Sequence, residues 1–275
     1  MKNLISTMWL ANHLNDADIC ILDCSWHLPA TKRDAKAEFA AAHITGAQFF
    51  DLDAISDTES KLPHMLPTAE KFGHEVTKLG VGNNKKIICY DSVGLFSAAR
   101  VWWMFKIFGH VNVAVLDGGL KKWQAENREI QSVVAAIKPN GHFWARLDLS
   151  MISTVTEVAN TKAQILDARS PARFRGEEPE PRAGVKPGHI PNAKNVHYAS
   201  LLHNNGTLRH PNDLKAAFHK AKVNLDKPIV TSCGSGVTAA ILTLALTELG
   251  AENLKLYDGS WAEWGASGRD IATGA

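Results

Sequence analysis

The sequence predicts two tandem α/β domains, each a mainly parallel β-sheet flanked by helices. Its 275 residues are more than one hydrophobic core usually serves, which favours two domains. A set of short motifs also occurs twice, in the same order. Within each copy, strand-like apolar runs alternate with helical runs, as in a parallel sheet covered on both faces.

The repeated motifs keep a nearly constant offset, which drifts only from 147 to 141 residues along the chain. They are Ser-Thr at 6–7 and 153–154, ILD at 21–23 and 165–167, H-I-x-x-A at 43–47 and 189–193, and an Asp-Gly turn at 117–118 and 258–259. Each Asp-Gly turn is followed at the same spacing by a tryptophan, Trp123 or Trp264. Chance does not keep such features in order, so the chain is a duplicated domain.

The elements of the two halves are expected in the same sequence. A helix begins near residues 6–7 or 153–154 and is followed by the strand ICILD or AQILD. A later strand (86–90 or 228–232) leads through a loop into an apolar helix (97–108 or 238–249) that ends at a glycine. A last strand ends at the Asp-Gly turn. We place the domains at 1–135 and 152–275, with an approximate linker at 136–151 that contains a turn at 139–141.

Composition excludes several classes of protein. Thirty basic and 28 acidic residues give a net charge of +2, which does not favour binding to nucleic acid or to a membrane surface. No apolar run approaches the roughly 20 residues that span a bilayer, and the N-terminus lacks the apolar region of a secretory signal. A cytoplasmic protein is expected. Four cysteines match neither a zinc pattern nor a disulfide framework, so neither a metal nor another cofactor is expected.

Cys233 stands apart from the other cysteines. It directly follows the strand PIVTS, at the edge of a parallel sheet where ligands bind, and it opens the loop C-G-S-G-V-T. Gly234 and Gly236 let successive backbone N–H groups point inward, and the next helix adds its positive end. This arrangement favours a thiolate. The remaining cysteines lie in strand-like surroundings and are expected to be buried thiols: Cys20, Cys24 and Cys89.

The first half provides an internal comparison. Its equivalent loop begins with Asp91 at the place of Cys233. A carboxylate cannot take up a sulfur atom, and its charge opposes an anionic substrate. One half is therefore expected to be catalytic and the other supportive.

The duplicated halves, the loop C-G-S-G-V-T and the C-terminal YDGSWAEW resemble the two-domain rhodanese family. The runs SWHLP, FFDLD, PHMLP and SAARVWW extend the resemblance over nearly the whole chain, although SAARVWW lacks a proline that is frequent in the family. The loop is similar to that of the family's 3-mercaptopyruvate branch, because the basic residues that follow the cysteine in the thiosulfate branch are absent. The resemblance implies a Cys233 persulfide that passes sulfur from 3-mercaptopyruvate to a thiol, such as thioredoxin or a small thiol, or to cyanide, with release of pyruvate.

The resemblance also implies roles for individual residues. Arg173 and Arg182 would hold the substrate carboxylate, for which the arginine fork is suited, whereas Arg175 would serve structure or solvent. The loop residues that would contact the substrate are Gly234, Gly236, Val237 and Thr238.

A proton relay is implied as well. It would consist of Ser235 together with Asp53 and His64 of the first half, which meet only if the active site lies between the halves. Without the resemblance, His64 between proline, methionine and leucine would be interpreted as a packed histidine.

Other functions were weighed against this interpretation. A C-x5-R phosphatase needs an arginine where this chain has Ala239, and the loop is not a cysteine-protease signature. A thiosulfate:cyanide sulfurtransferase is the alternative enzyme. A non-catalytic binding module is the alternative from another class, and the intact cysteine loop disfavours it.

Overall fold

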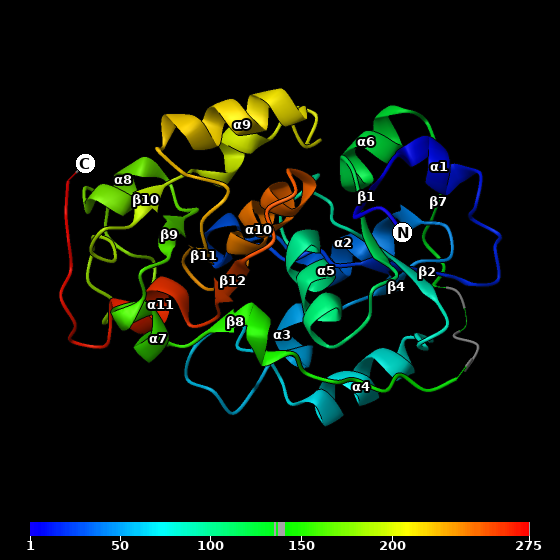
Figure 1. The fold of residues 1–275 in the computed structure, drawn as a ribbon. Helices are drawn as coiled ribbons and strands as arrows, with labels where there is room; N and C mark the ends of the chain where they lie inside the picture. Colours follow the sequence, from blue (N-terminus) through cyan, green and yellow to red (C-terminus); the bar gives the residue numbers. More distant parts are fainter. Residues whose placement is uncertain (135, 137–140, 275) are drawn as a thin grey trace. The chain divides into compact units, whose positions relative to one another are not determined.

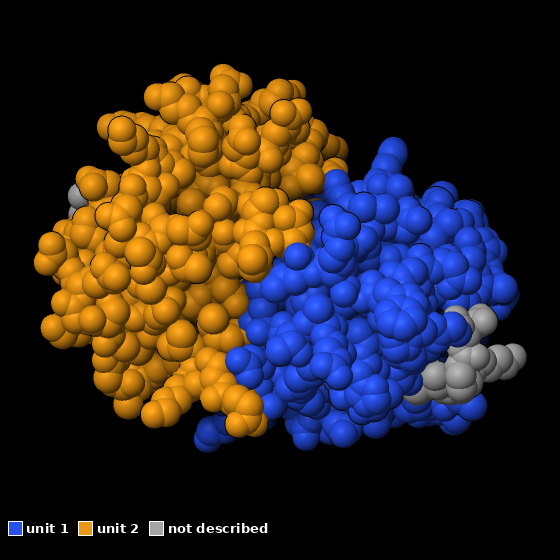
Figure 2. Space-filling model, turned by 60° about the horizontal axis from the view of Figure 1, so that its bottom comes forward, with its two compact units in different colours: residues 1–58, 66–147, 204–208 blue, residues 59–65, 148–203, 209–275 orange. Residues whose placement is uncertain are grey.

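The computed structural model describes residues 1–134, 136 and 141–274, which form two compact units (Figure 2). Unit 1 comprises residues 1–58, 66–147 and 204–208, and unit 2 comprises residues 59–65, 148–203 and 209–275. Each unit thus follows one half of the sequence but includes a short segment of the other half. Within the linker predicted at 136–151, residues 137–140 lie outside the described part, and with them most of the turn predicted at 139–141.

Unit 1 contains, in its described residues, a five-stranded parallel sheet with the order β1-β6-β5-β2-β4 (Figure 1). Its strands are β1 (Leu4–Ile5), β2 (Ile19–Asp23), β4 (Gln48–Phe49), β5 (Lys86–Tyr90) and β6 (Val113–Leu116). The central strand β5 is apolar and almost wholly buried, as expected for a strand covered on both faces. An antiparallel pair, β3 (His43–Ile44) and β7 (Ile130–Gln131), lies outside this sheet.

Four helices of unit 1 begin at side-chain caps. Ser6, Asp34, Asp51 and Thr68 each accept a hydrogen bond from a backbone N–H of the first turn that follows. The helices are α1 (Thr7–Ala11), α2 (Ala35–Ala41), α3 (Leu52–Ile55), α4 (Ala69–Lys78), α5 (Ala98–Ile107) and α6 (Gly119–Ala125), with a 3-10 turn at Pro29–Thr31. Helix α5 is buried on nearly every side, which explains why its sequence is apolar all round.

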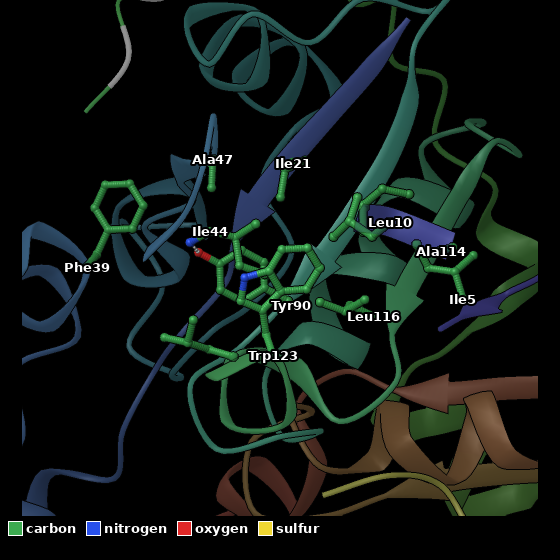
Figure 3. Packing of buried hydrophobic residues seen from close by; sticks show 12 residues of the cluster. Ile5, Leu10, Ile21, Phe39, Ile44, Ala47, Tyr90, Ala114, Leu116 and Trp123 are labelled. Atoms are coloured by element: carbon green, nitrogen blue, oxygen red, sulfur yellow. Dashed lines mark hydrogen bonds between the residues drawn. The ribbon is translucent and has the colours of Figure 1, made fainter. Parts of the chain in front are cut away.

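The repeated tryptophans are core residues. In unit 1, Trp123 packs with Tyr90, Leu116 and Ile44 in the buried cluster drawn in Figure 3. The Trp123 indole N–H donates to the carbonyl of Glu129 at 2.8 Å, so the polar atom of the buried ring is satisfied. In unit 2 the counterpart Trp264 joins a cluster with Tyr257 and Trp261.

Unit 2 repeats the sheet of unit 1. The strands that its described residues form are all parallel and have the order β10-β9-β11-β12-β8. They are β8 (Ile152–Ser153), β9 (Gln164–Asp167), β10 (Lys194–Asn195), β11 (Ile229–Ser232) and β12 (Leu254–Tyr257). Read from its other edge, this order is β8-β12-β11-β9-β10. When strands are matched by the sequence repeats, it is identical to the order β1-β6-β5-β2-β4 of unit 1. The predicted duplicated α/β fold is confirmed.

Two helices of unit 2, α7 and α8, also begin at side-chain caps. Thr154 and Glu157 form a reciprocal capping box at the start of α7. The helices are α7 (Val155–Asn160), α8 (Pro171–Arg175), α9 (Pro211–Lys220), α10 (Ala239–Glu248) and α11 (Ser260–Trp264), with 3-10 turns at Leu149–Met151 and Tyr198–Leu201. Among all described residues, no helix is long and apolar enough to cross a membrane.

Candidate active site

Cys233 lies at the carboxyl end of the central strand of unit 2. It follows Ser232, the last residue of β11, whose partner on β9 is Asp167. The Cys233 residue is only 2% exposed. Its backbone is held on both sides by the start of α11, because its N–H donates to Ser260 Oγ at 3.2 Å and its carbonyl accepts from the Trp261 N–H at 2.9 Å. The position of the sulfur-bearing residue is therefore fixed by the fold.

The equivalent loop of unit 1 surrounds a carboxylate of its own. Both oxygens of the buried Asp91 carboxylate accept backbone N–H groups of the same loop. The four donors are Val93 (3.0 Å) and Gly94 (2.9 Å) to Oδ1, and Phe96 (2.7 Å) and Ala98 (2.9 Å) to Oδ2. The loop is thus a cradle of N–H groups around an anion that the chain itself supplies.

The Cys233 loop has the same plan without a carboxylate. Gly236, three residues after Cys233, has φ 77°, and Gly94, three residues after Asp91, has φ 129°. Thr238 precedes α10 five residues after Cys233, whereas Ser97 precedes α5 six residues after Asp91. Between Gly234 and Ala239, no backbone N–H donates to a protein acceptor within the described chain. In unit 1 the corresponding N–H groups bind the Asp91 carboxylate.

Two other cysteines are unsuited to this chemistry. Burial raises the pKa of the Cys20 thiol to about 12. Burial also raises the pKa of Cys24 well above its ordinary value, and the neighbouring Cys89 adds to the effect. Both thiols therefore stay protonated at neutral pH. None of the four cysteines, all of which are described, forms a disulfide.

Ser235 and His64 meet within unit 2. His64 belongs to the segment 59–65, which the first half of the sequence contributes to this unit. Its Nδ1 lies 3.0 Å from the hydroxyl oxygen of Ser235, and both residues are 6% exposed. His64 has φ 58°, in the left-handed region that non-glycine residues rarely adopt. The structure thus brings together two members of the predicted relay.

Asp53 lies in unit 1. It is in α3, and its exposed carboxylate accepts a hydrogen bond from the Trp26 indole N–H at 3.1 Å. Unit 1 also receives the segment 204–208, which lies against the Asp91 loop: a Cβ placed on Gly94 would be 2.6 Å from the Cα of Gly206. Each cradle is therefore contacted by a segment from the opposite half of the sequence.

Arg173 approaches the Cys233 loop from α8. A Cβ placed on Gly234 would be 3.2 Å from Nη2 of Arg173, so a glycine here admits the guanidinium. Arg173 is paired with Glu180 at 2.5 Å and retains 21% exposure of its side chain. Arg182 is half-buried, and Arg175 forms an exposed ion pair with Glu177 at 2.6 Å.

Three residues next to this site were not predicted from the sequence. Glu180 and Arg169 form buried ion pairs behind Arg173, and the acidic, proline-rich run around Glu180 gave no sign of burial. Ser260 holds the Cys233 N–H with φ 49°, at the position where the first half has Gly119. The serine at a turn position where the other half has a glycine was the sequence signal that could have identified Ser260. Within the described residues, no cluster of three His, Cys, Asp or Glu could hold a metal ion.

The duplicated parallel sheets, each with a glycine-containing loop and a buried helix after its central strand, form a tandem pair of α/β domains of one type. The model of the rhodanese-like domain matches residues 6–126 and 154–267, and the chain belongs to this family. It is 44% identical to the 3-mercaptopyruvate sulfurtransferase of Escherichia coli strain K12 over 94% of this chain and 93% of that protein. It is 42% identical to the human 3-mercaptopyruvate sulfurtransferase, with coverage of 96% and 92%. The crystal structure of SseA from E. coli, described as a 3-mercaptopyruvate sulfotransferase, matches with a TM-score of 0.86 at 41% identity and covers 95% of this chain and 99% of that chain.

Proposed function

We propose that this protein is an enzyme that transfers sulfur from 3-mercaptopyruvate, through a persulfide on Cys233, to a thiol or to cyanide. The observation that carries the proposal is the loop that follows Cys233: the equivalent loop of the other half surrounds the Asp91 carboxylate with backbone N–H groups, and the Cys233 loop has no carboxylate of its own. The similarity to 3-mercaptopyruvate sulfurtransferases supports the choice of donor. We assign the covalent step to the second half (152–275) and a supporting role to the first (1–135).

The reaction divides into two displacements. The Cys233 thiolate attacks the sulfur of 3-mercaptopyruvate, and an S–S bond forms as the C–S bond breaks. The electron pair of the broken bond leaves on carbon as the enolate of pyruvate, which takes up one proton. A thiolate acceptor then attacks the outer sulfur of the persulfide, becomes a persulfide itself and returns Cys233 as thiolate; cyanide leaves as thiocyanate.

The surrounding residues serve these steps. Arg173 and Arg182 hold the substrate carboxylate, and the loop of Gly234, Gly236, Val237 and Thr238 surrounds the reacting sulfur. Ser235 and His64, 3.0 Å apart, pass the proton that the enolate needs, and Asp53 completes the relay. We further propose that the acceptor is thioredoxin or a small thiol and that the protein acts in the cytoplasm.

Thiosulfate is the alternative donor. It is a dianion, and residues 234–238 offer it backbone dipoles but no cationic side chain. The test compares the two donors: initial rates of pyruvate release from 3-mercaptopyruvate with a thiol acceptor, and of thiocyanate formation from thiosulfate with cyanide. We expect the higher kcat/KM with 3-mercaptopyruvate. A higher value with thiosulfate would make the alternative enzyme correct, and a lack of turnover with both would favour a binding module.

Replacing Arg173 with lysine is expected to raise the KM for 3-mercaptopyruvate roughly ten- to a hundredfold, because an ammonium cannot offer two parallel N–H donors to a carboxylate. Steady-state kinetics measure this change. Arg175→Lys is the matched control, since Arg175 lies two residues away in an exposed pair with Glu177. Equal KM values in the two variants would remove Arg173 from substrate binding.

Replacing His64 with asparagine is expected to lower kcat about a hundredfold, the usual contribution of a positioned proton-transfer group. Asparagine tolerates the left-handed backbone of this position, so the fold is retained. Alkylation of Cys233 by iodoacetamide, which needs no proton for a leaving enolate, is expected to stay unchanged. A kcat equal to that of the wild type would exclude His64 from the relay.

A further inference from the structure

A buried chain of charges lies behind Arg173. Arg169, whose side chain is 1% exposed, donates to both oxygens of Asp167 and, at 2.7 Å, to Oε1 of Glu180. Glu180 is 3% exposed and in turn accepts from Arg173. The two carboxylates balance the two guanidinium groups. Arg173, at 21%, is the only one of the four with a substantially exposed side chain.

Glu180 engages one particular edge of Arg173. Its Oε1 accepts from Nε at 3.3 Å and its Oε2 accepts from Nη2 at 2.5 Å. Glu180 does not occupy the other edge of the guanidinium, which is formed by Nη1 and the second N–H of Nη2. Nη1 and Nη2 lie 3.8 and 3.2 Å from the point where a Cβ on Gly234 would stand. The Nη1–Nη2 edge of the guanidinium therefore faces the loop. This edge can bind a carboxylate through two parallel hydrogen bonds.

The same chain of contacts reaches the nucleophile. The guanidinium of Arg169 stacks 4.5 Å above the ring of Trp261, and the Trp261 N–H donates to the carbonyl of Cys233. Asp167, which holds Arg169, is the register partner of the residue before Cys233. The support of Arg173 and the support of Cys233 are thus parts of one rigid arrangement at the ends of β9 and β11.

We infer that Glu180 is a positioning residue that aims Arg173 at the carboxylate of a substrate attached to Cys233, with Gly234 providing the space. This inference rests on the proposed function and deepens it. Without Glu180, Arg173 keeps its charge but loses its fixed direction. Attraction for anions in general then persists or increases, while the preference for a carboxylate next to the reacting atom declines.

The test uses two alkylating agents that differ in a carboxylate. Iodoacetate carries one and iodoacetamide does not. The ratio of the iodoacetate rate constant to the iodoacetamide rate constant at Cys233 therefore measures how much Arg173 favours a carboxylate next to the reacting atom. Both rates are followed on the Cys233 peptide by mass spectrometry. Glu180→Gln is expected to lower this ratio about fivefold or more while the iodoacetamide rate stays within about twofold. Glu177→Gln, which breaks the exposed pair with Arg175, is the matched control and should change neither.

Three results would overturn the inference: an unchanged ratio in Glu180→Gln, a higher ratio, or an equal fall of both rates, which means that Glu180 merely supports the loop. If Glu180→Gln does not fold, Glu180→Asp keeps the charge between the two arginines and should lower the ratio about twofold. An unchanged ratio there also contradicts the inference. Alkylation requires no sulfur transfer, so failure of the proposed donor in turnover assays is a separate outcome.

Discussion

Replacing Cys233 with serine will abolish pyruvate release from 3-mercaptopyruvate, with an expected loss of about 10³-fold or more. A hydroxyl is far less nucleophilic than a thiolate toward sulfur, and a serine cannot carry the sulfur atom as a persulfide. The cradle and Arg173 remain in the variant, so binding of the donor is retained. Steady-state release of pyruvate with a thiol acceptor measures the loss.

The matched control for this substitution is Cys20→Ser. Cys20 is partly buried in β2 of unit 1, and its pKa of about 12 keeps it protonated. We expect the activity of Cys20→Ser to stay within about twofold of the wild type. Comparable losses in the two variants would mean that Cys233 has no special role.

Replacing Asp91 with alanine will destabilise unit 1 by about 3 kcal/mol or more. The substitution leaves the N–H groups of Val93, Gly94, Phe96 and Ala98 without their acceptor. The last three of these hydrogen bonds are buried, and each unsatisfied buried donor costs about 1–3 kcal/mol before the loop relaxes. Urea denaturation, followed by hydrogen exchange of peptides from β5 and α5, measures the change in unit 1.

Asp34→Ala is the control for this loss of stability. Asp34 also accepts two backbone N–H groups, those of Lys36 and Ala37, but it does so at the exposed start of α2. Loss of such a cap costs about 1 kcal/mol. Equal losses in the two variants would contradict the view that the first cradle is stabilised by its own anion.

The sequence was sufficient to predict the fold, and it also singled out Cys233 as the candidate nucleophile, because both inferences depend on local patterns. The repeats paired the strands of the two halves, and the apolar periodicity located β5, β11, α5 and α10 to within a residue. The glycines after Cys233, read with the preceding strand, predicted a cradle whose plan the Asp91 loop displays.

The supporting residues were missed because tertiary structure decides their surroundings. Glu180, in an acidic, proline-rich run, resembles a solvated residue, and only the guanidinium groups of Arg169 and Arg173 allow it to be buried. His64 came from the family resemblance alone. Its left-handed backbone and its place beside Ser235 depend on the segment 59–65 packing into unit 2, which no periodicity reveals.

The central claim is that Cys233 carries the transferred sulfur, and a single turnover tests it most directly. The protein is exposed briefly to one equivalent of 3-mercaptopyruvate without an acceptor, and pyruvate and protein mass are measured together. We predict one pyruvate released for each sulfur atom gained, with the added sulfur on the peptide that contains Cys233 and its removal by a thiol or cyanide. Pyruvate release without a gain in mass, or added sulfur only on peptides containing Cys20, Cys24 or Cys89, would contradict the account.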